Sequence, residues 1–577
     1  MGHLLSLPTS LLFAVASRFL AAALLLVAAA YLYFWPIRRY FSHHRNLPGP
    51  YSSSVFWGAL PYVYSFPHPT TAYQNWLTTY GPTFQYPILL GNSRIITADL
   101  AAISYILSHP AIFPKPVHVR AALREMIGDG LVSEEGDVHK RTRKNLNPSL
   151  GPAAVRKMVP IFYDKSRELA ERLSSDLDDQ RDNRINFLWY ISRATLDMMG
   201  VAQFDHDFHA LSGEAEEIVD AYTGMFQVGT EVSVMTVLQF LLPVFKRIPT
   251  NRTAVLDRSL RTARRFGRKI IREKRDNLRS FDLEKDQDHD IGLLASMREV
   301  QSLEDITDKV TVKNQATSCP DERLTDEEIL DQVNTFMLAG YETTSTALCW
   351  CIYSLAKHPE IQERLRQELL DISEQQPDMQ VVASGSWALL MVTSDTLNAL
   401  PYLDAVIKES LRLSAPVPLA LREASQDISI PLSTPITGKD GNLMDRVEVG
   451  KGTTILMPIS NANTQLSIWG PRAEEFLPSR WLTPTPETYP GSAKSVPGVY
   501  SNLLTFWGGS RSCIGFRFAL AEIKVMLFVL IKSFRFEELE NRPLIEKKFS
   551  IVSHPWVVEE ENAGFQLPLK VSGVQMT

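Results

Sequence analysis

The sequence has few cysteines and no excess of positive charge, and each shortage excludes a class of protein. Its 577 residues include four cysteines, none of them in CxxC spacing. This disfavours a structural zinc site or a disulfide scaffold and fits a reducing compartment. Acidic residues number 65 against 59 basic ones, so we expect no nucleic-acid partner. Hydrophobic residues at 45% and charged residues at 21% exclude a disordered or fibrous chain.

An apolar run near the N-terminus is the first feature with a functional meaning. Phe19 to Trp35 contains no charged residue, and a helix crosses a bilayer with about 17–25 apolar residues. A cleaved signal peptide is the alternative, but its basic residues would precede the run, whereas Arg38 to Arg45 follows it. By the positive-inside rule the body then faces the cytosol. We expect a single-pass membrane anchor at residues 1–37, a basic and proline-rich hinge at 38–50 and one body at 51–577.

A long helix is predicted after a polar stretch, residues 282–322, which we interpret as a surface loop. Thr325 and Glu328 form a T-x-x-E capping box, which marks a helix start. Apolar residues then recur at spacings of 3 and 4, which predicts a helix of about thirty residues through the centre of the protein. Gly340 in its middle is a poor helix former. Either tight helix packing or a kink where a ligand meets the backbone would explain this glycine.

The last cysteine, Cys513, lies in a glycine-rich loop just ahead of an apolar helical run. A helix N-terminus points N–H groups and positive potential at this position, which favours a thiolate. Arg511 nearby could bind a carboxylate. A thiolate beside an arginine suits an iron porphyrin, with sulfur on the metal and the arginine on a propionate. A buried structural cysteine is the alternative.

The segment from Phe506 to Gly515 decides between these alternatives. It matches the pattern F-x-x-G-x-R-x-C-x-G, which occurs by chance in about one chain of this length in ten thousand. The pattern resembles the haem-binding signature of the cytochrome P-450 superfamily. The resemblance implies haem b (iron protoporphyrin IX) with Cys513 as the axial thiolate, and it places Gly509, Arg511 and both ends of the segment in the cofactor site.

Residues 339–344, AGYETT, are similar to the oxygen-binding helix motif of the same family. The resemblance implies that Ala339 and Gly340 line the cofactor. It also implies that Glu342 and Thr343 are the catalytic pair that relays protons.

Two further motifs follow in the order that the family shows. Glu409 and Arg412 match its E-x-x-R pair, and Arg480 lies in FLPSRW, which resembles its F-x-P-x-R-W segment. The resemblance implies that these three residues form a structural ion pair that locks the core around the haem. Glu409 and Arg412 are one helical turn apart, so they would pair on any helix.

Basic residues elsewhere are implied to bind the haem propionates. Gly136 to Arg143 resembles the family's W-x-x-x-R helix, with His139 where tryptophan is commoner. The resemblance implies that Arg143 reaches a propionate and leaves open whether His139 does. A solvated basic face, or a docking surface for an acidic partner, is the alternative. Arg422, by its spacing from Arg412, resembles another propionate ligand.

The resemblance implies a mainly α fold with small β-sheets, the cytochrome P-450 fold, with residues 51–577 as the haem-thiolate catalytic domain. The implied reaction inserts one oxygen atom from O2 into a substrate, with two electrons from NADPH. We find no convincing GxGxxG segment after a strand, so a separate NADPH–cytochrome P-450 reductase is the implied partner. Together with the anchor, this predicts an enzyme on the endoplasmic reticulum membrane, in contact with membrane lipid, with its catalytic domain in the cytosol.

Segments that resemble the family's substrate-recognition regions are mostly apolar, which predicts a lipophilic small-molecule substrate. One of them contains Val232–Phe245, which either dips into the bilayer or forms helix core. The motifs resemble those of fungal microsomal members, many of which decorate terpenoids, so we expect a terpenoid or related secondary metabolite. Two other functions remain open. One is a haem-thiolate isomerase or dehydratase, a class that usually lacks the acid–threonine pair, and the other is a haem-binding sensor or scaffold.

Overall fold

The computed structural model describes residues 9–33, 40–52, 54, 56–179, 184–229, 233–241, 245, 247–280, 324–375 and 393–574. The chain forms two compact units. The first contains Met1–Phe113 and Leu421–Pro458, and the second contains Pro114–Ala420 and Ile459–Thr577. The predicted loop at 282–322 lies outside the described residues.

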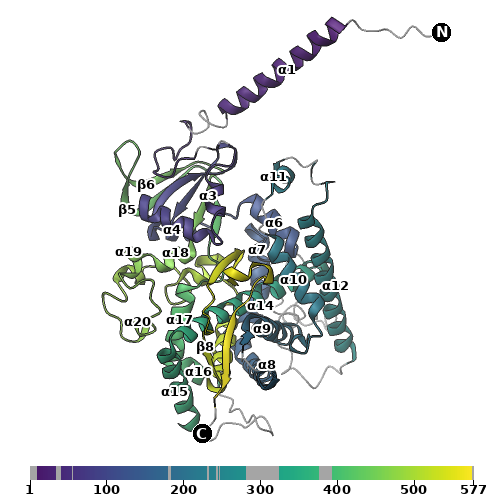
Figure 1. Cartoon of the computed structure of the whole chain (residues 1–577), viewed down its shortest axis with the longest axis vertical. Coiled ribbons are helices and arrows are strands. Elements are labelled where there is room, and N and C mark those ends of the chain that lie inside the picture. Colours follow the sequence, from purple (N-terminus) through teal and green to yellow (C-terminus); the bar gives the residue numbers. More distant parts are fainter. Residues whose placement is uncertain are drawn as a thin grey trace, which may run out of the picture. The chain divides into compact units, whose positions relative to one another are not determined.

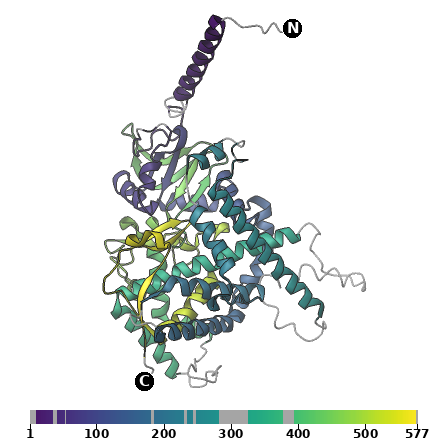
Figure 2. The same cartoon turned by 45° about the vertical axis from the view of Figure 1, so that its right-hand side comes forward.

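The first unit is built on small β-sheets. One sheet has the strand order β1-β2-β7-β4, in which β2 pairs antiparallel with β1 and parallel with β7. Strands far apart in the sequence, purple and green in Figure 2, therefore lie side by side. The second sheet is the antiparallel pair β5-β6. The strands are β1 (Thr83–Pro87), β2 (Ser93–Thr97), β4 (Ala420–Glu423), β5 (Ile428–Thr437), β6 (Leu443–Val449) and β7 (Thr454–Met457), and the helices are α1 (Thr9–Leu32), α3 (Leu60–Tyr64), α4 (Pro69–Tyr80) and α5 (Leu100–Ser108).

Helix α1 contains most of the predicted membrane anchor. It spans Thr9–Leu32 and includes Arg18. In the ranges that the structure describes, no helix is both long and apolar enough to span a membrane. The predicted transmembrane anchor at residues 1–37 is therefore not supported.

The second unit is mainly helical, as predicted, and contains every element that bears on the cysteine motif. Its long helices pack against one another around α14 (Figure 1). The helices are α6 (Val117–Ile127), α7 (Gly136–Leu146), α8 (Pro152–Asp179), α9 (Phe187–Phe204), α10 (Glu216–Gly229), α11 (Val234–Leu241), α12 (Asn251–Ser280), α14 (Asp326–Lys357), α15 (Pro359–Gln375), α16 (Ser394–Ala399), α17 (Pro401–Leu413), α18 (Ile459–Thr464), α19 (Leu466–Trp469), α20 (Ser479–Leu482), α21 (Gly491–Lys494) and α22 (Phe516–Ser533).

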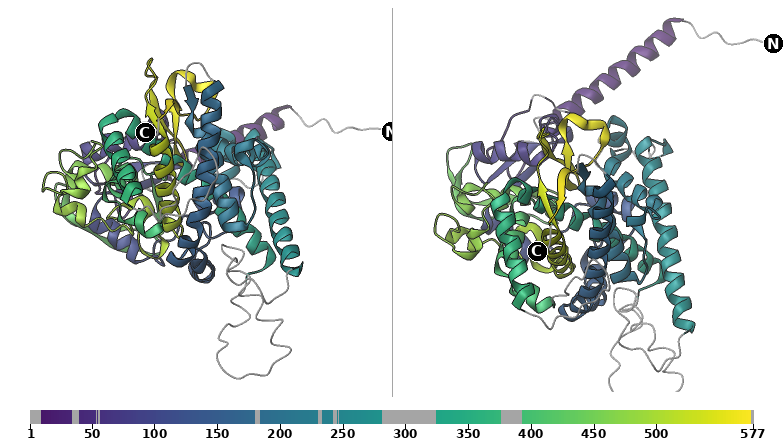
Figure 3. Two further views of the ribbon diagram at one scale, coloured as in Figure 1. Left: turned by 90° about the horizontal axis from the view of Figure 1, so that it is seen from below. Right: turned by 60° about the horizontal axis from the view of Figure 1, so that its bottom comes forward.

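Short strands complete the second unit near the C-terminus. They form a sheet of order β3-β11-β8 and the antiparallel hairpin β9-β10, and the C-terminal strands are yellow in Figure 3. Strand β10 packs against α14, so a segment close to the C-terminus in the sequence lies beside the central helix. The strands are β3 (Arg184–Asn186), β8 (Phe534–Glu537), β9 (Ile545–Ser550), β10 (Val552–Val557) and β11 (Pro568–Gly573).

Helix α14 confirms the predicted central helix and decides between the two explanations of its glycine. The Glu328 amide donates to Thr325 Oγ1 at 3.3 Å, and the Thr325 amide donates to the Glu328 carboxylate at 2.7 Å, so the capping box is present. The helix is 32 residues long and unbroken at Gly340. A Cβ added at Gly340 would lie 1.9 Å from Cε of Met199 on α9. Tight packing, rather than a kink, therefore explains the glycine.

Candidate haem site

Cys513 lies at the end of a loop that leads into α22, as the sequence predicted. The amide of Cys513 donates to the carbonyl of Phe506 at 2.9 Å, which closes the loop. Gly509 within it has a φ of +66°, in the left-handed region that favours glycine. The closed loop presents the cysteine just ahead of Gly515, the N-cap residue of α22.

Cys513 is exposed to solvent, but many protein atoms surround its thiol. Its neighbours Ser512 and Phe518 are buried, whereas Cys513 itself is exposed. Burial raises the pKa of the thiol, and the Gly515 amide and the Arg143 guanidinium only partly oppose this. The Gly515 amide at the N-terminus of α22 thus acts in the direction that the sequence predicted, although burial has the larger effect. A bound metal ion would deprotonate a coordinating thiol outright.

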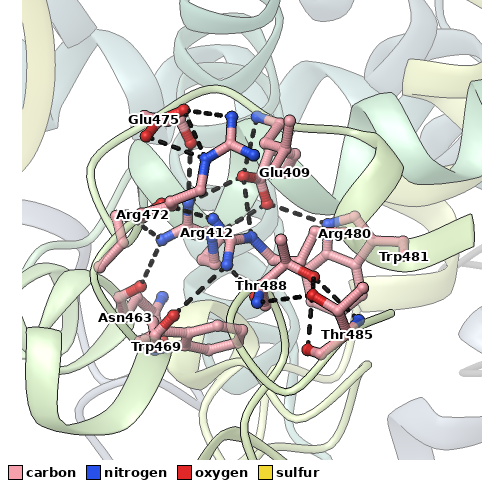
Figure 4. Close-up of polar contacts among 12 residues, drawn as sticks. Glu409, Arg412, Asn463, Trp469, Arg472, Glu475, Arg480, Trp481, Thr485 and Thr488 are labelled. Carbon is pink, nitrogen blue, oxygen red and sulfur yellow. Dashed lines mark hydrogen bonds and ion pairs between the residues drawn. The ribbon is translucent and has the colours of Figure 1, made fainter. Parts of the chain in front are cut away.

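Glu409, Arg412 and Arg480 form a buried ion cluster, so the predicted contact among the three residues is present (Figure 4). Arg412 donates to both carboxylate oxygens of Glu409, at 2.9 and 2.8 Å, and Arg480 Nε donates at 3.2 Å. All three side chains are 0% exposed. The indole of Trp481 and the amide of Leu477 also donate to this carboxylate, each at 3.0 Å. Paired and fully hydrogen-bonded charges of this kind are the ones that proteins can bury.

Backbone carbonyl groups accept the guanidinium hydrogens that Glu409 does not bind. All of these acceptors lie between residues 463 and 488, so the cluster fastens that segment to α17. The acceptors are the carbonyls of Asn463, Ala473 and Glu475 for Arg412, and those of Trp469, Arg472 and Thr488 for Arg480.

Asn463 connects the ion cluster to the cysteine loop. Its carbonyl accepts from Arg412 at 3.0 Å, and its side chain bonds to the residues just before Phe506. The Leu504 amide donates to Asn463 Oδ1 at 3.1 Å, and Asn463 Nδ2 donates to Thr505 Oγ1 at 2.9 Å. Thr505 Oγ1 donates in turn to a carbonyl of α17 at 2.7 Å. The ion cluster and the loop that carries Cys513 are thus joined by continuous hydrogen bonds.

Two of the predicted propionate ligands lie on α7, beside the cysteine loop. Arg143 donates to the carbonyl of the residue before Cys513 at 2.7 Å. Burial lowers the pKa of Arg143, although the Cys513 thiol acts against this. Burial also lowers the pKa of His139 to about 3, with the charges of Arg511, Lys115 and Arg143 adding to the effect. His139 is therefore neutral near pH 7 and can offer a hydrogen bond but no charge.

Arg511, predicted to bind a propionate, has a protein partner in this structure. Its guanidinium pairs with the Glu135 carboxylate and donates to the Glu134 carbonyl at 3.3 Å. Glu135 also accepts from Lys115 Nζ at 3.3 Å. Burial lowers the pKa of Arg511, while Glu135 acts in the opposite direction. The Glu135 carboxylate thus pairs with two cations, Lys115 and Arg511. Because Arg143 lies close by, the site keeps an excess of positive charge.

These residues fit an iron porphyrin. The accessible Cys513 thiol is a suitable axial sulfur donor. The positive charge left over around Arg143 and Arg511 suits two propionate groups, because guanidinium groups bind carboxylates in bidentate geometry.

Ala339 and Thr343 lie on a side of α14 that stays open. Ala339 is exposed and Thr343 is half-buried, whereas Leu338 and Tyr341 are 7% and 1% exposed. Thr343 Oγ1 donates to the Ala339 carbonyl at 2.7 Å, so the lone pairs of the hydroxyl remain able to accept. The structure therefore brings Ala339 and Thr343 together, while Gly340 packs against α9.

Glu342 does not share the surroundings of Thr343. Its carboxylate is buried and contacts Nε2 of His554, on strand β10. The neighbouring residues of the predicted acid–threonine pair therefore have different partners.

Arg422 belongs to the first unit, where it lies on β4 and is buried. Its guanidinium donates to the Leu421 carbonyl at 2.8 Å. Its role as a propionate ligand stays a prediction.

Asn463 and His554 make contacts at this site that sequence reasoning did not identify. Neither residue belongs to a motif quoted above, and their side chains reach partners far away in the chain. Asn463 and Thr505 are separated by 42 positions, and His554 and Glu342 by 212. Local spacing holds no signal for such contacts.

We predict that replacing Glu409 by glutamine loosens haem binding. The change preserves the shape of the side chain but leaves Arg412 and Arg480 buried without a counter-charge, which costs about 3–5 kcal/mol. Because the cluster holds the cysteine loop, the variant should release haem at a clearly lower temperature. Haem absorbance followed during heating measures this.

Glu475→Gln is the matched control for this experiment. Glu475 pairs with Arg472 at the surface, where the two side chains are 51% and 44% exposed, so breaking that pair should change haem retention little. Identical release temperatures for the wild-type protein and E409Q would contradict the role of the cluster.

Comparison with known proteins agrees with this site. A family model described as Cytochrome P450 matches residues 47–558. The chain is 36% identical over 533 residues to Cytochrome P450 monooxygenase 205 of Postia placenta, which covers 91% of this chain and 92% of that protein. It is 33% identical over 574 residues to Ganoderic acid synthetase of Ganoderma lucidum, with 96% and 99% covered. The chain therefore belongs to the cytochrome P450 family and is a monooxygenase, an oxidoreductase that carries haem on a cysteine thiolate.

Proposed function

We propose that this monooxygenase inserts one oxygen atom from O2 into a lipophilic small molecule, a terpenoid or related secondary metabolite. The observation that carries the reaction class is the accessible Cys513 thiol in a loop built into the core, beside Arg143. The substrate class is supported by a relative whose name refers to ganoderic acid, a terpenoid. The apolar character of the segments that resemble substrate-recognition regions also supports it.

The chain's own residues hold the cofactor and handle protons. Haem held through Cys513 would supply the oxygen chemistry, because thiolate ligation favours O–O cleavage. The hydrogen bond from the Cys513 amide to Phe506 fixes the position of the sulfur. On α14, Thr343 Oγ1 donates its hydrogen to the Ala339 carbonyl. The oxygen can therefore accept a hydrogen bond from a water molecule and hold that water there. The Glu342 carboxylate, one residue away, can hold or release a proton.

We further propose that the electrons come from NADPH through a separate NADPH–cytochrome P-450 reductase. The sequence contains no convincing nucleotide-binding segment, and we expect Lys and Arg on the face that carries Cys513 to meet acidic groups of such a partner. The location at the endoplasmic reticulum and the contact with membrane lipid, including that of Val232–Phe245, stay predictions. Cell fractionation tests both.

A haem-thiolate isomerase or dehydratase is the competing enzyme class, and it would need neither O2 nor a reductase. The pair Glu342 and Thr343 argues against it, because a relay for protons serves O–O cleavage. A haem-binding sensor or scaffold would bind haem without turnover. Dependence of product formation on NADPH and reductase separates both classes from a monooxygenase.

The decisive experiment expresses the chain with a reductase and supplies terpenoid scaffolds. We expect a product that is heavier by one oxygen atom, and 18O2 should label it when NADPH is present. Mass spectrometry measures the label. Product without O2 or NADPH would favour the isomerase class. If hydrophilic compounds alone were converted, the proposed substrate class would be wrong.

The role of Cys513 has its own test. Cys513→Ser removes the sulfur donor, so the reduced protein with carbon monoxide should lose the absorption typical of thiolate ligation. Cys351→Ser is the control, because Cys351 is buried within α14. A C513S protein with an unchanged spectrum would refute the ligand assignment.

Thr343→Ala tests the handling of protons. The variant should retain haem but divert NADPH electrons to the formation of hydrogen peroxide. The amount of product per NADPH should fall about tenfold or more, because general acid–base groups contribute large factors to the rate. Thr343→Ser keeps the hydroxyl and should stay close to the wild-type protein. Undiminished coupling of NADPH to product in T343A would argue against the proposed role.

A further inference from the structure

His554 is the group in direct contact with the Glu342 carboxylate. Its Nε2 meets Oε1 of Glu342 within hydrogen-bonding distance, and the two side chains are 1% and 10% exposed. When Glu342 is ionised its oxygens only accept, so in that state Nε2 carries the hydrogen of this contact. The pair joins the middle of α14 to β10.

Aromatic rings hold the imidazole of His554 in place. Phe565 is stacked on it, with ring centroids 4.2 Å apart and an angle of 10° between the planes. Phe226 on α10 approaches edge-on at 5.6 Å. Ser550 Oγ lies 3.3 Å from Nδ1. With the ring confined in this way, Nε2 is directed at Glu342.

Other polar groups near Glu342 do not replace this partner. The Tyr341 hydroxyl lies near the carboxylate, and burial raises its pKa well above the usual value, so it stays neutral and can donate to Glu342 but supplies no charge. Arg193 on α9 is the nearby cation, but its guanidinium is bound to both carboxylate oxygens of Glu216 at 2.7 Å. His554 is the partner of Glu342 that comes from a distant part of the chain and is held in place by aromatic rings.

We propose that His554 is a positioning residue for the monooxygenase reaction: it holds the Glu342 carboxylate in the orientation in which that carboxylate holds and releases protons. A buried carboxylate that loses its partner must change its rotamer or become protonated. Either change moves or removes the site at which the proton is held. The inference rests on the proposed function, since it assigns His554 to the proton supply of that reaction.

The test uses the haem-loaded full-length protein with its reductase and three variants. His554→Phe keeps a ring against Phe565 but has no nitrogen, while His554→Gln keeps a donor close to the position of Nε2. Ser553→Ala, on the same strand, is the control. Two quantities are measured: product formed per NADPH, and the infrared stretching frequency of carbon monoxide on the reduced protein. The frequency reports polar groups near the ligand without any turnover.

H554F should lose coupling about as strongly as Glu342→Gln, and both should shift the infrared frequency in the same direction. The double variant H554F/E342Q should be no worse than either single variant, because the two residues act as one unit. H554Q and S553A should stay close to the wild-type protein in both measurements.

Equal behaviour of H554F and H554Q in both measurements would overturn the proposal, because the ring nitrogen would then not matter. If H554F does not retain haem, the result for H554Q tests the proposal. Coupling of NADPH to product in H554Q that equals the wild-type value supports the proposal, and coupling as poor as that of E342Q overturns it. A wild-type protein that makes no oxygenated product, yet shows the predicted infrared shifts in its variants, would refute the proposed function and leave the contact intact.

Discussion

A single carboxylate, that of Glu409, pairs with two arginines in the interior of the second unit, and the position of the haem ligand depends on it. Arg412 and Arg480 bind Glu409 and use their remaining hydrogens on backbone carbonyls. Asn463 links this cluster by hydrogen bonds to the residues before Phe506. The carbonyl of Phe506 accepts a hydrogen bond from the amide of Cys513 at 2.9 Å. A loop with glycines could adopt many conformations. It is confined to one because its start is fastened to a buried charge cluster and its end to the first turn of α22.

Two neighbouring polar residues of α14, Glu342 and Thr343, lie in different surroundings. The hydroxyl of Thr343 lies on the open side, whereas the carboxylate of Glu342 lies in an apolar setting with His554. An unbroken helix supports both, because Gly340 lets α9 approach closely without disturbing the helical hydrogen bonds. The histidine that contacts this carboxylate comes from β10, a distant part of the chain.

The sequence was informative where the physics is local. A capping box and a periodic apolar face specify α14, and a glutamate one turn before an arginine specifies the pair on α17. The expected transmembrane anchor is not supported, since no helix among the described residues is long and apolar enough to span a membrane. Contacts of Asn463 and His554 could not be predicted, since they join segments whose proximity exists only in the folded chain.

The scaffold presents the sulfur of Cys513 to the iron of a haem. X-ray absorption at the iron edge of the purified, haem-loaded protein measures this directly. We expect one sulfur neighbour together with the porphyrin nitrogens. An iron surrounded by nitrogen and oxygen alone, in protein that has bound a full complement of haem, would contradict it.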